Sequence, residues 1–290
     1  MPCQYKYSWP LACLSQGESA VDEDQGSYDG AANYACRMTA AVTGWRRHFQ
    51  QQWPFFFVEM AATRRYPSSD SAAQLAALRL AQRSVLRLPK VDFVTAIDLG
   101  SDNGSKYSPR KDGIARRMAR LIARELYNSD ALSIAEDPPR ILSISMDGMA
   151  KAVQLVFSGS GVRVGATANS APASCERVEH SPFELGFDDG TWMRLTPEAN
   201  TSPGVVMLRI PVVSMHRAHG MRDEPTPTEV RYAWEDSPAC ALYAASTQNA
   251  VQRVAVHPAA PFRIAIQRLF SDGSRYASTH ISRQHSSIAL

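Results

Sequence analysis

The tetrapeptide Gln16-Gly17-Glu18-Ser19 places an amide, a glycine, a carboxylate and a hydroxyl at the end of an apolar stretch, Trp9–Leu14. This pattern predicts a strand that runs into a tight polar turn, which is where open α/β sheets bind ligands. The Gln16 amide could donate a hydrogen bond to an oxyanion in acyl transfer. Gly17 would let the backbone pass close to an acetyl group or supply a positive φ, and Glu18 could orient a histidine or hold the loop. The alternative is an ordinary strand-end turn.

The composition excludes some classes of function. The 290 residues could form one large domain or two small ones, and 44% hydrophobic residues allow a sizeable core. The sequence has no apolar run of about 18 residues, so we expect no membrane span, and the N-terminus has no signal-peptide pattern. The net charge of +3 is too small and too evenly spread to predict nucleic-acid binding.

The cysteines and histidines show no metal-binding pattern. The five cysteines are scattered, odd in number, and without a C-x-x-C pair or a Cys/His cluster of zinc spacing. Buried or free thiols are the favoured interpretation, and one or two disulfides are the alternative if the protein is secreted. His216 and His219 could suggest a metal pair, but no third ligand lies near them in the sequence. We therefore expect no metal ion and no organic cofactor.

Strand-like and helix-like segments alternate over the first 135 residues. Apolar residues at helical spacing predict helices at about 28–50 and 70–87. Continuous apolar runs at Trp53–Met60 and Val91–Leu99 predict strands that are buried on both faces. This alternation predicts a mostly parallel, doubly wound sheet.

A further helix is predicted after the second of these strands. Its apolar residues recur at helical spacing and form one stripe: Ile114, Met118, Leu121, Ile122 and Leu126. Four arginines fall largely outside this stripe and are most simply interpreted as a solvated face: Arg116, Arg117, Arg120 and Arg124.

The pattern changes after Pro138-Pro139. Short period-two runs of apolar residues, separated by turn residues, predict β-strands: Val153–Phe157, Val206–Val212, Val230–Trp234 and Phe262–Ile266. They indicate a β-sandwich or jelly-roll-like module. We therefore predict an α/β domain at 1–137, a β-rich module at 138–270 and a disordered tail at 271–290.

Four segments, in order, resemble one family of enzymes. They are LACLSQGES, PFFFVEM, VDFVTAIDLG with YSPRKDGIARRMARLIAREL, and VRYAWEDSPACALY with PAAPFR. Their order and spacing resemble the sialate O-acetylesterase family, a branch of the SGNH-type hydrolases related to carbohydrate acetylesterases. The resemblance covers residues 9–266 and corresponds to the C-terminal part of the family's length.

The resemblance implies a partial three-layer, flavodoxin-like α/β fold followed by a β-sandwich-like module. It implies a hydrolase that removes O-acetyl groups from sialic acids or other acetylated sugars by serine-type acyl transfer, without a cofactor. Gln16, Gly17 and Glu18 match the family's Gln-Gly-Glu block. The localisation is unknown, although family members commonly work in secreted or lysosomal settings.

The same resemblance implies that the catalytic set is incomplete in this chain. In the family, the nucleophile lies in a Gly-x-Ser type turn well before the Gln-Gly-Glu block, and no such turn precedes Gln16. Tyr107-Ser108-Pro109 aligns with the family's Ile-His-Pro, so Ser108 stands where the family has its catalytic histidine. A serine cannot accept and return a proton near neutral pH as an imidazole can.

Three interpretations follow. The chain is an esterase fragment that needs a missing N-terminal half, a non-catalytic carbohydrate-binding relative (a pseudoenzyme), or a decayed reading frame. In the second, Trp192, Tyr232 and Trp234 could stack on sugar rings, although aromatic residues at period two are more often core. We expect no acetylesterase activity from the chain alone. We also expect an unpaired sheet edge, with the aromatic run Trp53–Phe57 poorly covered.

Overall fold

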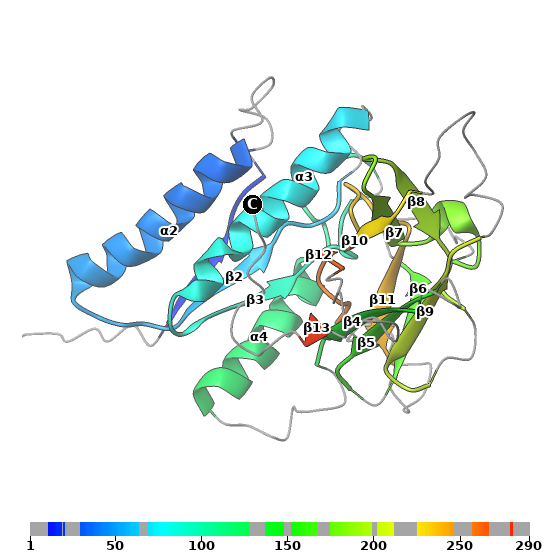
Figure 1. The fold of residues 1–290 in the computed structure, drawn as a ribbon. Helices are drawn as coiled ribbons and strands as arrows, with labels where there is room; N and C mark the ends of the chain where they lie inside the picture. Colours follow the sequence, from blue (N-terminus) through cyan, green and yellow to red (C-terminus); the bar gives the residue numbers. More distant parts are fainter. Residues whose placement is uncertain are drawn as a thin grey trace, which may run out of the picture.

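The structure is a computed structural model, and its helices and strands fall into two parts (Figure 1). The described residues from Leu11 to Tyr127 form a parallel sheet with helices on both faces, and antiparallel sheets follow. The structure describes these residues: 11–18, 20, 30–63, 69–101, 103–127, 137–147, 152–159, 161–167, 175–198, 202–211, 225–245, 257–266 and 279–280.

Three parallel strands form the sheet of the first part. They are β1 (Ala12–Ser15), β2 (Phe55–Glu59) and β3 (Val91–Thr95), and they lie side by side in that order. The pairing is parallel throughout, with Ala12 opposite Phe55 and Phe55 opposite Val91. Parallel neighbours require crossover connections, which the helices supply.

Helices cover both faces of this sheet. α2 (Gly30–Phe49) connects β1 to β2, and α3 (Ser69–Gln82), continued by the 3-10 helix η1 (Arg83–Arg87), connects β2 to β3. Both crossovers step in the same direction along the sheet, so their right-handed sense puts α2 and α3 on one face. α4 (Lys111–Tyr127) covers the other face (Figure 1).

The strand β2 is buried on both sides, as its continuous apolar run predicts. Phe55 and Phe57 pack in the cluster under α2 and α3, whereas Phe56 and Val58 pack in the cluster under α4. Each of the three phenylalanines is at most 3% exposed. The expectation that the run Trp53–Phe57 would be poorly covered is wrong for Phe55–Phe57, because helices of this chain close both faces of β2.

The second part consists of antiparallel sheets. One four-stranded sheet has the order β12-β10-β7-β8, another has the order β13-β4-β5-β9, and β11 pairs with β6. A short 3-10 helix, η3 (Val178–His180), precedes β7. The strands are β4 (Ile141–Asp147), β5 (Ala152–Phe157), β6 (Val162–Ala166), β7 (Phe183–Phe187), β8 (Trp192–Leu195), β9 (Val205–Arg209), β10 (Pro227–Tyr232), β11 (Cys240–Ala244), β12 (Phe262–Ala265) and β13 (Thr279–His280). An α/β layer structure followed by a sandwich-like module confirms the fold class that the sequence predicts.

The C-terminal end contributes one short strand to the second part. Thr279 and His280 form β13, which pairs with β4. The remainder of the predicted disordered tail at 271–290 lies outside the described residues. The strand β13 therefore accounts for only two residues of the predicted tail. The boundaries of the predicted domains stay a prediction.

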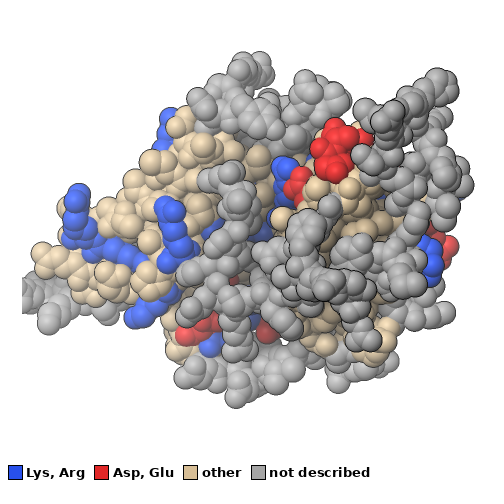
Figure 2. Space-filling view, viewed as in Figure 1, with Lys and Arg blue, Asp and Glu red and all other residues tan. Residues whose placement is uncertain are grey.

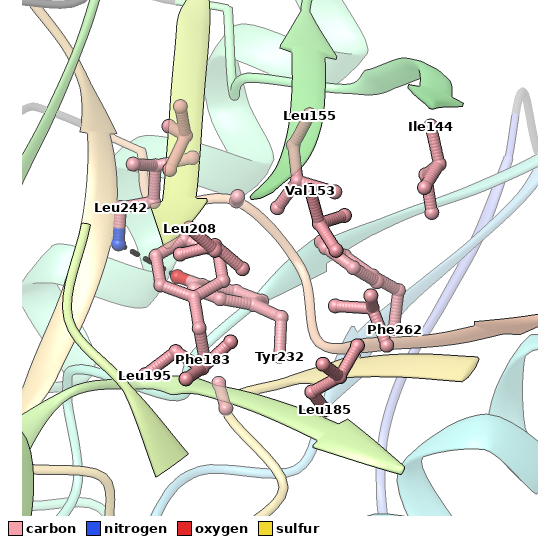
Figure 3. Close-up of a cluster of buried hydrophobic side chains, with 14 of the residues drawn as sticks. Ile144, Val153, Leu155, Phe183, Leu185, Leu195, Leu208, Tyr232, Leu242 and Phe262 are labelled. Atoms are coloured by element: carbon pink, nitrogen blue, oxygen red, sulfur yellow. Dashed lines mark hydrogen bonds between the residues drawn. The ribbon is translucent and has the colours of Figure 1, made fainter. Parts of the chain in front are cut away.

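The two four-stranded sheets enclose one apolar core. Figure 3 shows side chains from β5 and β7 converging on Tyr232 and Phe262, whose rings stack with centroids 5.2 Å apart. Tyr232 is fully buried, and its hydroxyl accepts the N–H of Leu242 at 2.6 Å. Ile97, from the segment after β3, packs in the same cluster, so the two parts of the chain share a core. Tyr232 is a core residue and offers no face to a sugar ring.

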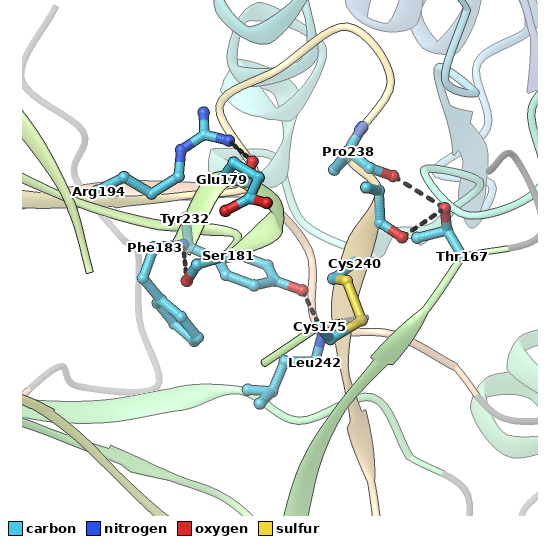
Figure 4. Close-up of a disulfide and its surroundings, with 11 residues drawn as sticks. Thr167, Cys175, Glu179, Ser181, Phe183, Arg194, Tyr232, Pro238, Cys240 and Leu242 are labelled. Atoms are coloured by element: carbon cyan, nitrogen blue, oxygen red, sulfur yellow. Dashed lines mark hydrogen bonds between the residues drawn. A yellow bond between two sulfur atoms is a disulfide. The ribbon is translucent and has the colours of Figure 1, made fainter. Parts of the chain in front are cut away.

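A disulfide joins Cys175 to Cys240 at the start of β11 (Figure 4). Cys13 and Cys36 are free and exposed. The interpretation of the cysteines as unpaired thiols is therefore wrong for Cys175 and Cys240. The two residues are 65 positions apart in the sequence, and a pairing at that distance leaves no local pattern that could predict it.

The face of the molecule drawn in Figure 2 mixes both signs of charge. Lys and Arg lie at separate places over α2 and the neighbouring elements, with Asp and Glu gathered elsewhere on the same face. Among the described helices, none is long and apolar enough to cross a membrane.

Candidate functional site

The carboxyl ends of the three parallel strands meet at one edge of the sheet, and the Gln-Gly-Glu block lies there. Gln16 follows β1, Met60–Thr63 follows β2, and Ala96–Ser101 follows β3. Thr63 forms a parallel bridge with Ser101, so the segments after β2 and β3 stay side by side beyond the strands. This edge is where open α/β folds place their ligands.

The Gln16 side chain is exposed, and Tyr34 holds it in one orientation. Tyr34 of α2 is 7% exposed, and its hydroxyl donates to Gln16 Oε1 at 2.8 Å and to Gln16 O at 3.1 Å. Burial raises the pKa of the Tyr34 phenol, and the negative charge of Glu18 raises it further. A hydrogen bond with Gln82 acts in the opposite direction and lowers the pKa. The phenol is therefore a donor at neutral pH. Because Oε1 is engaged, the amide N–H groups of Gln16 face away from Tyr34, and they have no acceptor among the described residues.

Gln82, the last residue of α3, ties this strand end to β2. Its side chain is 1% exposed, and Nε2 donates to Gln16 O at 3.0 Å while Oε1 accepts the N–H of Met60 at 2.9 Å. A buried amide left without partners costs about 1–3 kcal/mol, so these bonds fix the spacing between Gln16 and Met60.

Two glycines permit close backbone approach at the same edge. Gly17 has a φ of +141°, and a Cβ at this position would lie 2.7 Å from Met60 Sδ. A Cβ at Gly100 would collide with the carbonyl of Ala62. The segment after β3 can therefore pack against the segment after β2 only because Gly100 lacks a side chain, whereas Gly17 is favoured by its positive φ.

Ser108 lies in the loop between β3 and α4, and its hydroxyl closes that loop. The side chain is buried, donates to the carbonyl of Leu99 and accepts the N–H of Arg110 at 3.1 Å. No hydrogen bond joins Ser108 to the Gln-Gly-Glu block within the described part of the chain. In this arrangement the hydroxyl stabilises the entry to α4, and it has no basic lone pair matched to proton transfer near neutral pH.

A buried ion pair supports the segment that leads to Ser108. Arg117 of α4 donates through Nη1 and Nη2 to the two oxygens of Asp98, each at 2.7 Å, and Nη1 also donates to Thr95 O at 2.7 Å. Tyr243 of β11 donates to Asp98 Oδ2 at 3.2 Å. Arg117 is 3% exposed, so its assignment to a solvated face is wrong. A bidentate carboxylate and a carbonyl engage both terminal nitrogens of the guanidinium inside the protein.

Arg79 of α3 joins the second part of the chain to the carboxyl end of β2. The side chain is fully buried, and its guanidinium donates to four backbone carbonyls. They belong to Met60 at 3.1 Å, Ala61 at 3.2 Å, Glu235 at 2.8 Å and Asp236 at 3.0 Å. Burial lowers the pKa of Arg79 to about 10, so the group keeps its charge at neutral pH.

The aromatic residues considered for sugar stacking are buried or have a cation on the ring. The Arg231 guanidinium lies 3.7 Å from the ring centroid of Trp192 and is held there by Glu184 at 2.8 Å. Trp234 is 8% exposed. A cation on the ring face occupies the position that a sugar ring would need.

The structure thus brings Gln16, Gly17 and Glu18 together at one strand end, with Ser108 on the loop after β3. Glu18 is half-buried, and no hydrogen bond joins it to a described histidine. His216 and His219 lie outside the described residues. Within the described part, no group of three His, Cys, Asp or Glu side chains could hold a metal ion.

Tyr34 and Gln82, the two side chains that fix the Gln-Gly-Glu block, are not predicted by the sequence pattern. Tyr34 falls on the buried stripe of α2, beside Met38 and Val42. Gln82 lies four residues after Leu78, on the buried side of α3. A polar side chain on an otherwise apolar stripe needs a partner inside the protein, and this signal could have identified Gln82.

Among solved structures, the fold is similar to that of a carbohydrate acetylesterase from Xanthomonas citri. The TM-score is 0.63 at 21% sequence identity, and the alignment covers 88% of this chain and 50% of that one. The chain therefore spans about half the length of that enzyme. At this identity the similarity shows that the fold is shared. No protein-family model matches the sequence, and no curated protein matches it at a significant level.

Proposed function

We propose that this chain is the oxyanion-binding and β-module part of a carbohydrate esterase of the sialate O-acetylesterase type. Its substrate class would be an O-acetylated sialic acid or another acetylated sugar. The observation that carries the proposal is the geometry of Gln16 at the carboxyl end of a parallel strand. Its Oε1 is engaged by Tyr34, and its N–H donors are left for a ligand. The shared fold with a carbohydrate acetylesterase supports the same assignment.

In this proposal Gln16 would stabilise the oxyanion that forms when an acetyl ester is attacked. Gly17 would keep the approach to Gln16 open, since it carries no side chain beside Met60. Ser108 occupies the position of the family's base, and its hydroxyl is engaged by Leu99. The nucleophile would therefore come from outside the described residues, no base would stand at position 108, and the chain alone would not turn over an ester.

The open side of β1 could receive a partner that supplies the missing nucleophile. Among the described strands, β1 has β2 as its neighbour on one side and lies at the edge of the sheet on the other. Ala12 donates its N–H to Pro54 O at 2.9 Å, so the N–H of Cys13 points away from β2. The Cys13 and Ser15 side chains are exposed. An edge of this kind is a template for a further strand, such as one from an N-terminal half.

The test is reconstitution with the N-terminal half of a sialate O-acetylesterase that carries its Gly-x-Ser turn. Hydrolysis of an O-acetyl sialoside is measured for the chain alone, for the complex, and for the complex with Ser108→His. We expect turnover only in the last case. Adding Gln16→Ala to that complex should lower kcat about 10²–10³-fold, whereas the matched change Gln51→Ala at an exposed position should not.

Two other outcomes would distinguish the alternatives. Saturable turnover by the unmodified chain alone would overturn the proposed incompleteness of the catalytic set. Saturable binding of the acetylated sialoside without turnover in any combination would favour the non-catalytic, carbohydrate-binding relative, and calorimetric titration measures it directly.

A further inference from the structure

The Asp236 carboxyl is buried without a hydrogen-bond partner, although its own backbone is firmly held. The residue is 7% exposed, and neither Oδ1 nor Oδ2 has a partner within the described part of the chain. Its carbonyl accepts hydrogen bonds from Arg79 Nη2 at 3.0 Å and from the N–H of Thr63 at 3.1 Å. Buried polar groups are almost always paired, so an unpaired carboxyl in this position requires an explanation.

The charged groups around Asp236 are already engaged with other atoms. Arg79 directs its donors at backbone carbonyls and forms no ion pair with the Asp236 carboxyl. Glu59 of β2, which also faces Arg79, is held by Arg83 of η1, with Nε to Oε1 at 2.6 Å. Glu235, the acidic neighbour in the same loop, pairs with an arginine of β8. Burial raises the pKa of Asp236 to about 7, with Arg79 opposing this shift and Glu235 adding to it.

We propose that the Asp236 carboxyl is a protonation-dependent latch that controls how tightly residues 233–239 are held on the carboxyl end of β2. When the carboxyl is protonated, it is neutral, and Arg79 donates hydrogen bonds to the carbonyls of Glu235 and Asp236 as in the structure. When it loses its proton to solvent, a bare carboxylate remains in a desolvated position beside Arg79. The guanidinium then turns toward the carboxylate and weakens the bonds that hold the loop, because a buried charge needs a charged partner.

The latch reaches the Gln-Gly-Glu block through three further hydrogen bonds. Met60 accepts from Arg79 through its carbonyl at 3.1 Å and donates through its N–H to Gln82 at 2.9 Å. Gln82 in turn donates to Gln16 O at 3.0 Å. A movement of Arg79 therefore changes the position of Met60 and, through Gln82, that of Gln16. The inference stands on these contacts and does not depend on the proposed esterase function.

The experiment is a pH titration of the full chain, labelled with ¹⁵N and followed by NMR from pH 5.5 to 8.5. The reporters are the backbone amides of Thr63 and Gly17, one at each end of the path. The variant Asp236→Asn keeps the shape of a neutral carboxyl and cannot ionise, so it should fold. Glu235→Gln is the matched control, because it removes the neighbouring acid and leaves Asp236 in place.

We expect both amide signals to shift with one midpoint near pH 7 in the wild-type chain. The transition should be absent in Asp236→Asn, and it should persist in Glu235→Gln with a lower midpoint, since the like charge is gone. The same transition in Asp236→Asn would overturn the proposal, because a histidine would then be the titrating group. Absence of a transition in the wild type would overturn it as well. A response at Thr63 without one at Gly17 would refute the coupling to the Gln-Gly-Glu block.

Discussion

Replacing Arg117 by methionine deletes a guanidinium that three hydrogen bonds hold inside the protein. Two of these bonds go to Asp98 and one to Thr95 O, each at 2.7 Å. The change keeps most of the aliphatic side chain, so the packing of α4 against the sheet is largely retained. It leaves the Asp98 carboxylate buried, with Tyr243 at 3.2 Å as its remaining partner among the described contacts.

The expected loss for Arg117→Met is about 3–5 kcal/mol in the free energy of unfolding, the usual cost of stranding one member of a buried ion pair. Domains of this kind are stable by about 5–15 kcal/mol, so the loss is a large fraction of the total. The double variant Asp98→Leu/Arg117→Met removes both charges. It should be at least about 2 kcal/mol more stable than Arg117→Met, because no charge remains unpaired inside the protein.

The assay is urea unfolding at 25 °C, followed by far-UV circular dichroism. With an m-value of about 2–3 kcal/mol/M, the midpoint of Arg117→Met should fall by about 1–2.5 M. Arg124→Met is the matched control on the same helix, since Arg124 pairs with acidic residues near the surface at 32% side-chain exposure. Its loss should stay below about 1 kcal/mol. Equal losses for the two single variants would refute the reasoning, as would a double variant less stable than Arg117→Met.

Three further predictions concern other parts of the chain. Reduction of the disulfide Cys175–Cys240, or its replacement by serines, should lower stability by about 4 kcal/mol, since it closes a loop of 65 residues; an unchanged thermal midpoint in dithiothreitol would contradict this. Burial lowers the pKa of His257 to about 3, whereas an unfolded histidine titrates near about 6.5. The free energy of unfolding should therefore fall as the pH drops below about 6.5, by up to about 1.4 kcal/mol per pH unit. In acid-unfolding curves, His257→Gln should make this dependence on pH less steep. Gly100→Ala should lower the free energy of unfolding by at least about 1–3 kcal/mol, because the new Cβ would collide with the carbonyl of Ala62. Gly44→Ala should raise it by about 0.5–1 kcal/mol, because the new Cβ would lie inside α2 with open space around it. Calorimetric midpoints that move in the same direction for both variants would count against the packing argument.

The sequence predicts the layer structure because periodicity is a local property. The predicted helix at 28–50 is observed as Gly30–Phe49, and the predicted strand Trp53–Met60 as Phe55–Glu59. A short, continuous aromatic run favours a strand covered on both sides, and the chain itself supplies the helices that cover it. The alternation of strands with helices then leaves a parallel sheet as the consistent topology.

Positions of charged residues on a helix were harder to predict. Arg117 lies three residues after Ile114 and four before Leu121, so it shares their buried face. A charged residue on that face is normally interpreted as solvated, because burial without a partner is prohibitive. The partner, Asp98, belongs to the end of a strand, and only the packing of α4 on the sheet brings the two together.

What the sequence alone determined is the class of fold and the place of the Gln-Gly-Glu block at a strand end, since both follow from local patterns of apolar and polar residues. What only the tertiary structure decided is which side chains hold that block. Tyr34 is 18 residues from Gln16 and Gln82 is 66 residues from it, yet both meet it directly. Asp236 meets Arg79 across 157 positions. Such partners are chosen by the three-dimensional packing of elements, because a hydrogen bond depends on distance in space and leaves no periodic trace along the chain.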